Sequence, residues 1–224
     1  MKKLILPIGL LWLVACSNNA DQKATPTESS KGTTVVTDEL PDKDELAPVT
    51  QVFTNLDSNF NTGSFYPSGI DSVQYAQLVK IDSGSMKEFI PYLIYNADSS
   101  LAADPYSYNY IIHQQKGKTK VSEAGPDVEI GLVDLKQNSR RRLWFSGPSS
   151  LILDAKWKSK NELLLGGVEQ IDTSGYQPFV LVINVTNNHI DRWQSDEMIT
   201  GQLNDVLKQK LEAQLNATKT TRAF

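Results

Sequence analysis

The chain has little cysteine, and that shortage excludes one way of stabilising a fold. Cys16 is the only cysteine in 224 residues, so no disulfide can form within the chain. The fold must therefore depend on an apolar core rather than on a disulfide framework. Hydrophobic residues make up 40% of the sequence. A body of about 170 residues with that composition is large enough to bury such a core.

The chain also lacks a basic surplus. Its formal net charge is −4, and loss of Lys2 and Lys3 would take it to −6. A mildly acidic chain does not have the electrostatic footprint of a nucleic-acid binder, so we expect no nucleic-acid partner. The one basic cluster is Arg140-Arg141-Arg142, beside Trp144. We interpret it as a solvated hairpin end, with an anionic ligand or a phospholipid headgroup as the alternative.

Residues that commonly carry chemistry are scarce. The two histidines, His113 and His189, have no partner at a metal-ligand spacing, so we expect no metal and no cofactor. Neither Gly-x-Ser-x-Gly nor Ser-x-x-Lys occurs at a credible place, and no glycine loop fits a phosphate. The acidic stretches 38–45 and 191–197 do not define a catalytic pair. We therefore assign no catalytic residue.

Long apolar runs are missing as well. The N-terminus has Lys2 and Lys3, then an apolar run from Leu4 to Val14, about half of the ~20 residues that a membrane span needs. A basic start followed by a short apolar run is typical of a secretory signal. The run ends in Leu13-Val14-Ala15-Cys16, which resembles the lipobox of bacterial lipoproteins.

The lipobox resemblance implies a signal peptide over residues 1–15, cleaved after Ala15. It also implies a diacylglyceryl group on the Cys16 sulfur and an acyl chain such as palmitate on the new N-terminus, so that the membrane is a partner through the lipid. Ser17 resembles the outer-membrane sorting class. We expect the protein in the bacterial cell envelope, at the periplasmic face of the outer membrane or on the cell surface.

Residues 16–49 are polar and contain Pro26, Pro41 and Pro48, without a helical or strand period. Such a segment cannot bury enough surface to offset its ordering entropy, so we predict a disordered tether. We interpret the tether as a plain spacer; reach across the envelope, or an export signal near Asp21, is the alternative.

The body, residues 50–224, is predicted to be mainly β: an antiparallel meander sheet or sandwich with a C-terminal amphipathic helix. Alternating or β-branched segments predict the strands. They lie at 51–56 (a strand or a strap), 73–81, 88–95, 106–113, 128–135, 141–145, 151–157, 162–168, 177–185 and 190–193. We expect Pro91 at an edge or a bulge, because it cannot donate to a ladder.

Two segments of the body are similar to each other. Residues 133–144 and 183–193 both read as a strand, an Asn-containing turn and a strand that ends in Trp. The stretch 153–193 resembles one blade of a β-propeller. The chain offers too few such units for a closed ring, so we expect an open or sandwiched meander.

Apolar residues at helical spacing predict a helix over 195–216, capped by Ser195. We expect its apolar stripe to cover a sheet face; docking of a partner or of a second copy is the alternative. The aromatics are interpreted as core, with a sugar or peptide platform as the alternative: Tyr106, Tyr108, Tyr110, Trp144, Trp157 and Trp193.

The anchor, the tether and the absence of a catalytic set favour a non-enzymatic binding or assembly module of the envelope, with an envelope protein as a possible partner. The alternatives are a hydrolase of envelope glycans or peptides and a carrier of a small ligand. A hydrolase would need a cleft that holds two carboxylates with well-separated pKa values. A carrier would need a large apolar pocket.

Overall fold

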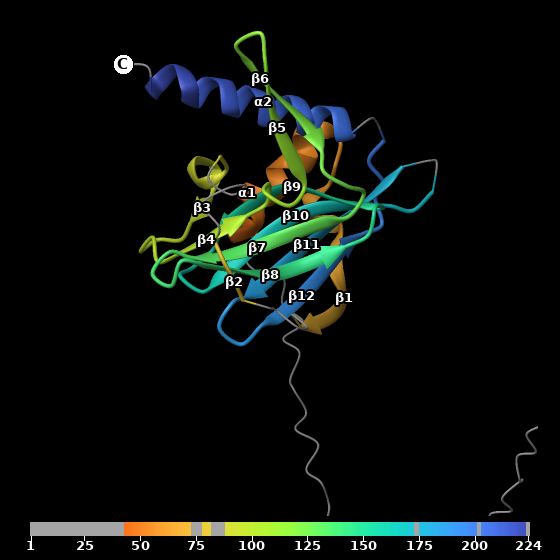
Figure 1. Ribbon diagram of the computed structural model, residues 1–224. Helices are drawn as coiled ribbons and strands as arrows, with labels where there is room; N and C mark the ends of the chain where they lie inside the picture. Colours follow the sequence, from red (N-terminus) through yellow and green to blue (C-terminus); the bar gives the residue numbers. More distant parts are fainter. Residues whose placement is uncertain (1–42, 73–77, 82–87, 173–174, 201–202, 223–224) are drawn as a thin grey trace, which may run out of the picture. The chain divides into compact units, whose positions relative to one another are not determined.

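The computed structural model describes residues 43–72, 78–81, 88–172, 175–200 and 203–222 (Figure 1). Cys16, the lipobox and residues 17–42 of the expected tether lie outside this part. The helices are α1 (Lys43–Leu56) and α2 (Leu203–Arg222), with the 3-10 turns η1 (Thr62–Ser64) and η2 (Ile90–Tyr92). The strands are β1 (Phe65–Ser72), β2 (Val79–Lys80), β3 (Ile94–Tyr95), β4 (Leu101–Asp104), β5 (Tyr110–Gln115), β6 (Lys118–Glu123), β7 (Val128–Asp134), β8 (Ser139–Ser146), β9 (Ser150–Trp157), β10 (Glu162–Gln170), β11 (Tyr176–Asn184) and β12 (His189–Ser195).

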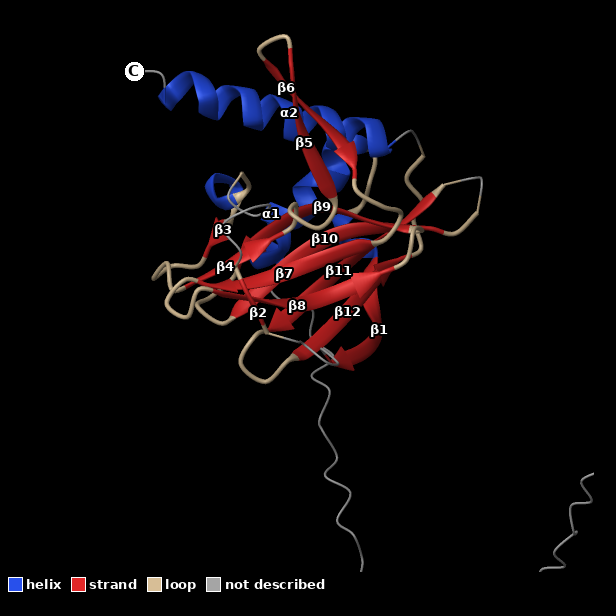
Figure 2. Cartoon of the chain, viewed as in Figure 1, coloured by secondary structure: helices blue, strands red, loops and turns tan. Residues whose placement is uncertain are grey.

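The described strands form two five-stranded antiparallel sheets and a separate hairpin (Figure 2). Sheet A has the order β1-β12-β11-β10-β9, and sheet B has the order β2-β8-β7-β4-β3. The hairpin is β5-β6. The fold prediction is confirmed: the protein is mainly antiparallel β, with meander connections, two packed sheets and a C-terminal helix.

Sheet A is the middle layer, covered on both faces. Leu163 and Leu165 of β10 pack with sheet B residues such as Ile130. On the other face, Leu164 of β10 packs with Phe53 of α1. Because both faces are buried, β10 and β11 have continuous apolar runs instead of an alternating pattern.

Glycine lets α1 approach sheet A closely. A Cβ atom on Gly166 of β10 would lie 2.7 Å from the backbone oxygen of Val49 in α1. Val49 itself is fully buried. The contact between helix and sheet at this point therefore requires a residue without a side chain.

The internal similarity corresponds to two hairpins with the same turn, β7-β8 and β11-β12. Asp134 and Asn184 occupy equivalent places, and each accepts hydrogen bonds from two backbone N–H groups of its own turn. Asn138 and Asn188 follow with φ of 50° and 60°, a conformation that Asn tolerates. The hairpins lie in different sheets, and β9–β12 form one consecutive meander within sheet A.

The N-terminal boundary of the body differs from the prediction. Helix α1 contains residues 51–56, which we expected as a strand or strap, and also residues 43–49, which we placed in the tether. Leu46, Val49 and Phe53 recur at helical spacing and are buried in the core. Pro48 inside the helix, and the β-branched and aromatic residues after it, concealed that period.

Two further predicted strands are only partly correct, and of a third, 73–81, residues 73–77 lie outside the described residues while β2 covers Val79–Lys80. Residues 88–95 form a turn, η2 and the short β3, and Pro91 lies in the first turn of η2, where its missing N–H costs little. Residues 106–109 form a turn in which Asn109 and Tyr110 both donate their backbone N–H to the carbonyl of Tyr106. Strand β5 begins only at Tyr110, while β1, β4 and β6 were not predicted.

The C-terminal helix is confirmed as an element, but its start is wrong. Ser195 ends β12 instead of capping the helix, and its hydroxyl lies 2.6 Å from that of Ser64. Ile199 is buried and forms a bridge with Tyr176, so the chain stays extended beyond Ser195. The bridge between Ile199 and Tyr176 therefore outweighs the helical spacing of the apolar residues around Ile199.

Candidate functional site

The hairpin β5-β6 packs against α2, and we call these three elements the hairpin–helix arm. Val121 of β6 is buried together with Leu211 and Leu215 of α2. Figure 1 shows the hairpin crossing α2, with its tip beyond the helix. The tip is Lys116-Gly117, both with positive φ, as in the two-residue turns that match strand twist. A lone hairpin is marginal in water, so α2 is what holds it.

Polar side chains of α2 seal the outer edge of β6. Glu212 accepts a hydrogen bond from the backbone N–H of Val121 at 3.0 Å and an ion-paired one from Lys120 Nζ at 2.7 Å. Asn216 accepts from the N–H of Thr119 at 3.0 Å and donates to its carbonyl at 3.2 Å. The hydrogen bond from Lys120, then that from Val121, lowers the pKa of Glu212. Glu212 thus remains ionised and holds this edge at neutral pH.

No second strand pairs with the outer edge of β5 in the described part of the chain, and we call this edge open in that sense. Its sequence, Tyr-Ile-Ile-His-Gln-Gln, carries no formal charge at neutral pH and no proline. Ile111 is 47% exposed. Edge strands are normally blocked by charge, proline or a covering element, because their free backbone groups recruit other strands. The two edges of one hairpin therefore differ: β6 is closed and β5 is open.

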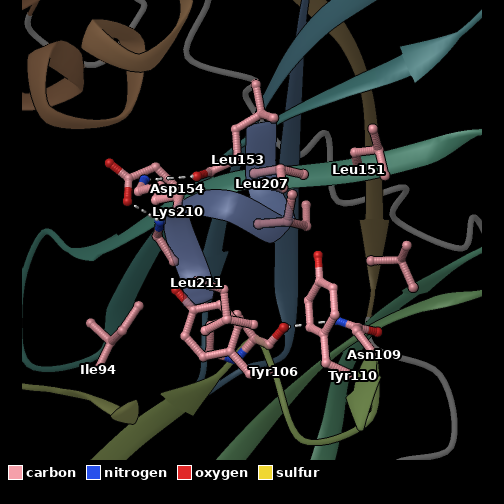
Figure 3. Close-up of a pocket in the computed structure, with 14 residues that line it drawn as sticks. Ile94, Tyr106, Asn109, Tyr110, Leu151, Leu153, Asp154, Leu207, Lys210 and Leu211 are labelled. Atoms are coloured by element: carbon pink, nitrogen blue, oxygen red, sulfur yellow. Dashed lines mark hydrogen bonds between the residues drawn. The ribbon is translucent and has the colours of Figure 1, made fainter. Parts of the chain in front are cut away.

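Tyrosines lie at the base of the arm. The rings of Tyr106 and Tyr110 are 6.4 Å apart, and burial raises the pKa of each to about 12. Beside them, Figure 3 shows a small cavity under α2, where Lys210 Nζ donates to the carbonyl of Leu153. Its volume of about 50 Å³ has room for only one or two water molecules, so it is too small for a ligand.

The arginine cluster is split between two faces of β8. Arg140 and Arg142 lie on the outer face of sheet B, where both pair with Glu129 and Arg140 also pairs with the buried Asp104. Arg140 crosses β7 directly over Gly131, since a Cβ there would clash with the guanidinium. Burial lowers the pKa of Arg140, but the charges and hydrogen bonds of Asp104 and Glu129 outweigh it and the net shift is upward. These residues form an internal ion network, not a solvated hairpin end.

Arg141 points to the opposite face. Its Nη1 donates to Asn188 Oδ1 at 2.6 Å, and its Nη2 donates to the carbonyl of Val185 at 2.7 Å. It thus joins β8 of sheet B to the β11-β12 turn of sheet A. Among the described residues, no carboxylate pairs with it.

The three tryptophans are core residues, as expected. Trp144 and Trp193 are buried, and Trp157 packs against the core with its Nε1 donating to the carbonyl of Ile94 at 2.7 Å. The three tyrosines do not share a face: Tyr108 is 39% exposed and contacts Phe145, away from the Tyr106–Tyr110 pair. The residues therefore do not form one aromatic platform.

The histidines lie apart. His113 Nε2 is 2.7 Å from Ser122 Oγ, and His189 Nε2 is 3.0 Å from Asp191 Oδ1. In the described part of the chain, no three His, Cys, Asp or Glu side chains are grouped to hold a metal ion. Over the same residues, neither helix is long and apolar enough to cross a membrane.

The contacts that seal β6 were not predicted. They join residues that are 91 and 97 positions apart in the chain, so no local pattern reveals them.

The chain was compared with protein-family models, curated proteins and solved structures. No family model matches it, and neither a curated protein nor a solved structure matches it significantly. Any assignment of function must therefore come from the residues themselves.

Proposed function

We propose that the protein is a bacterial envelope lipoprotein, anchored through lipid on Cys16, that acts as a binding or assembly module. The anchor rests on the lipobox and on the short apolar run before it. The lipidated cysteine carries two or three acyl chains, which together hold the protein in the membrane. A single chain would give only marginal binding. The body is then free to engage an envelope protein within reach of the tether.

The observation that carries the binding role is the open edge of β5 beside the sealed edge of β6. An extended segment of another protein can add to such an edge as a third strand, with affinity from main-chain hydrogen bonds. The chain closes one edge with Glu212 and Asn216 and leaves the other uncharged. That asymmetry directs a partner to β5.

The charge of the hairpin indicates which kind of segment fits. Lys116 and Lys118 are exposed at the tip, and no carboxylate pairs with either in the described part of the chain. Opposite charges across an interface favour encounter and fix the register of pairing. The proposed partner segment is therefore extended, with acidic residues that reach the tip of the hairpin.

In-cell photo-crosslinking tests the binding site. A photoreactive residue in place of Gln115 on β5 is expected to capture one envelope protein at near-equal stoichiometry. The control places it at Lys136, which is exposed in the β7-β8 turn of sheet B and lies outside the arm. Capture of the same protein with equal yield from Lys136, or no capture from Gln115, would contradict the proposal.

The anchor has its own test. Mass spectrometry of the N-terminal peptide of the mature protein is expected to show lipid on Cys16, and Cys16→Ser is expected to remove both the lipid mass and the membrane association. A wild-type N-terminus that begins elsewhere, or carries no lipid, would overturn the anchor without affecting the proposed role of β5.

A further inference from the structure

A second pocket lies at one end of the sandwich, away from the arm. Its walls come from both sheets: Leu101 and Leu132 on β4 and β7, and Val185 at the end of β11. Its volume is about 270 Å³, equivalent to roughly nine water molecules in the liquid. One side is therefore apolar and the space is large enough for a small organic molecule.

The polar side of this pocket contains Arg141 and Ser139, neighbours on the inner face of β8. Two hydrogen bonds, to Asn188 and to the carbonyl of Val185, hold the guanidinium in a fixed orientation. Its Nε–H and the second hydrogen on each Nη have no partner among the described residues. A fixed guanidinium with free N–H groups binds a carboxylate well, because the geometry of the two groups matches.

Two features show that polar groups on this side of the pocket lack partners among the described residues. Burial lowers the pKa of Arg141, and no carboxylate pairs with it in the described part of the chain. Ser139 is 95% buried, and its Oγ finds no hydrogen-bond partner there either. Buried polar groups without partners are costly, and a ligand that supplies both an anion and an acceptor would satisfy them.

The one carboxylate that lines the pocket does not fill this role. Oδ1 of Asp134 accepts the N–H groups of Lys136 and Gln137, which commits it to the β7-β8 turn. By contrast, Arg140 and Arg142, on either side of Arg141, are neutralised by Asp104 and Glu129. Of the three consecutive arginines, Arg141 is thus the one with charge left for a ligand.

We propose that this pocket binds a small organic carboxylate. The carboxylate pairs with Arg141. It accepts from Ser139 once rotation about the Cα–Cβ bond turns the covered Oγ toward the pocket, and a short apolar chain lies against Leu101, Leu132 and Leu78. The leucines select an organic acid over inorganic phosphate, which would leave them in contact with water. This site is independent of the β5 edge and of the lipid anchor.

Titration calorimetry of the whole soluble chain with hexanoate tests the proposal. Hexanoate is expected to bind, and Arg141→Gln to weaken it by about tenfold or more, the loss of one charge-assisted interaction. Ser139→Ala is expected to weaken it less. Arg142→Gln is the matched control, because the side chain of Arg142 leaves the opposite face of the same strand. The affinity of the Arg142→Gln protein for hexanoate should stay within twofold of the wild type, which corresponds to about 0.4 kcal/mol.

Two comparisons identify the ligand class. Hexanamide, which keeps the apolar chain and removes the charge, and inorganic phosphate are both expected to bind much more weakly than hexanoate. Because Arg141→Gln also removes a contact between the sheets, the Arg141 Nε–H resonance of the wild type is followed during the hexanoate titration, and it should shift. No binding of hexanoate, equal binding of hexanamide or phosphate, or an unmoved Nε–H resonance would overturn the proposal.

Discussion

The central sheet and the hairpin–helix arm are stabilised in different ways. Strands β10 and β11 are covered on both faces, and their neighbours pair with both of their edges. The arm has one small apolar cluster, and polar side chains of α2 close one of its two edges. Burial on all sides fixes the register of a strand. The arm gives up part of that burial, and β5 pairs with only one strand in the described part of the chain.

The largest effect is expected in the central sheet. Phe179 of β11 is fully buried and packs against Trp144 between the sheets. Phe179→Ala should lower the free energy of unfolding by about 3–5 kcal/mol, from lost transfer energy and an unfilled cavity. Chemical denaturation measures it. Phe145→Ala, at a site that is 41% exposed, is the control and should cost far less. Similar costs for the two would contradict the assigned core.

A comparable truncation in the arm should act locally. Leu215 of α2 is 2% exposed and packs in one cluster with Val121 and Leu211. Leu215→Ala should destabilise the hairpin by about 2–5 kcal/mol. If the arm opens locally at a smaller free energy than that, the opening free energy sets the upper limit of the effect. Amide hydrogen exchange should show faster exchange in β6 and unchanged protection in β10 and β11. Uniform loss of protection would mean that the arm and the sheets unfold together.

A smaller effect is expected where α1 meets sheet A. Gly166→Ala places a methyl group against the Val49 carbonyl, an overpacking that should cost about 1–3 kcal/mol. Gly147→Ala, which has nothing within 4 Å of the added carbon, is the matched control. Thermal denaturation of the two variants compares them. A stable Gly166→Ala protein would show that α1 can move away from the sheet at little cost.

The smallest effect should be a pH dependence confined to the arm. The folded-state pKa of Glu212 lies below its ordinary value, so its stabilising contribution is complete above that ordinary value and is lost as pH falls through the folded pKa. The protection factor of the Val121 amide, which corrects for the pH dependence of intrinsic exchange, should therefore fall in acid. Glu212→Gln, which keeps an acceptor but no charge, should remove this acid step; an identical step in both proteins would assign it to another group.

The sequence predicts the strands of the central sheet because two signals agree there. The apolar run of β10 is long and its ends carry polar turn residues, and the Asn-containing turns fix the hairpins β7-β8 and β11-β12. Helix α1 was missed because Pro48 and the β-branched residues after it indicate a strand locally, whereas burial of Val49 and Phe53 against sheet A determines the outcome. Tertiary contact overrode local propensity.

The candidate sites were less predictable than the fold. The arginine cluster is visible in the sequence, but alternation along β8 sends Arg141 to one face and its neighbours to the other, and the register with β7 decides which of them meet Glu129. The closed edge of β6 depends on Glu212 and Asn216, which are distant in the chain. Sequence spacing can suggest a surface helix, but it cannot show that the helix closes one strand edge and leaves another open.

The most direct test of the role of β5 is a comparison of two lysine substitutions at one level of the hairpin. Ile111 on β5 and Ser122 on β6 are cross-strand neighbours. A lysine on an edge strand blocks the addition of another strand. Ile111→Lys should therefore abolish recovery of the crosslinked envelope partner from cells, while Ser122→Lys, on the sealed strand, should leave it intact. Equal recovery from the two variants, or a greater loss with Ser122→Lys, would contradict the claim that the partner pairs with β5.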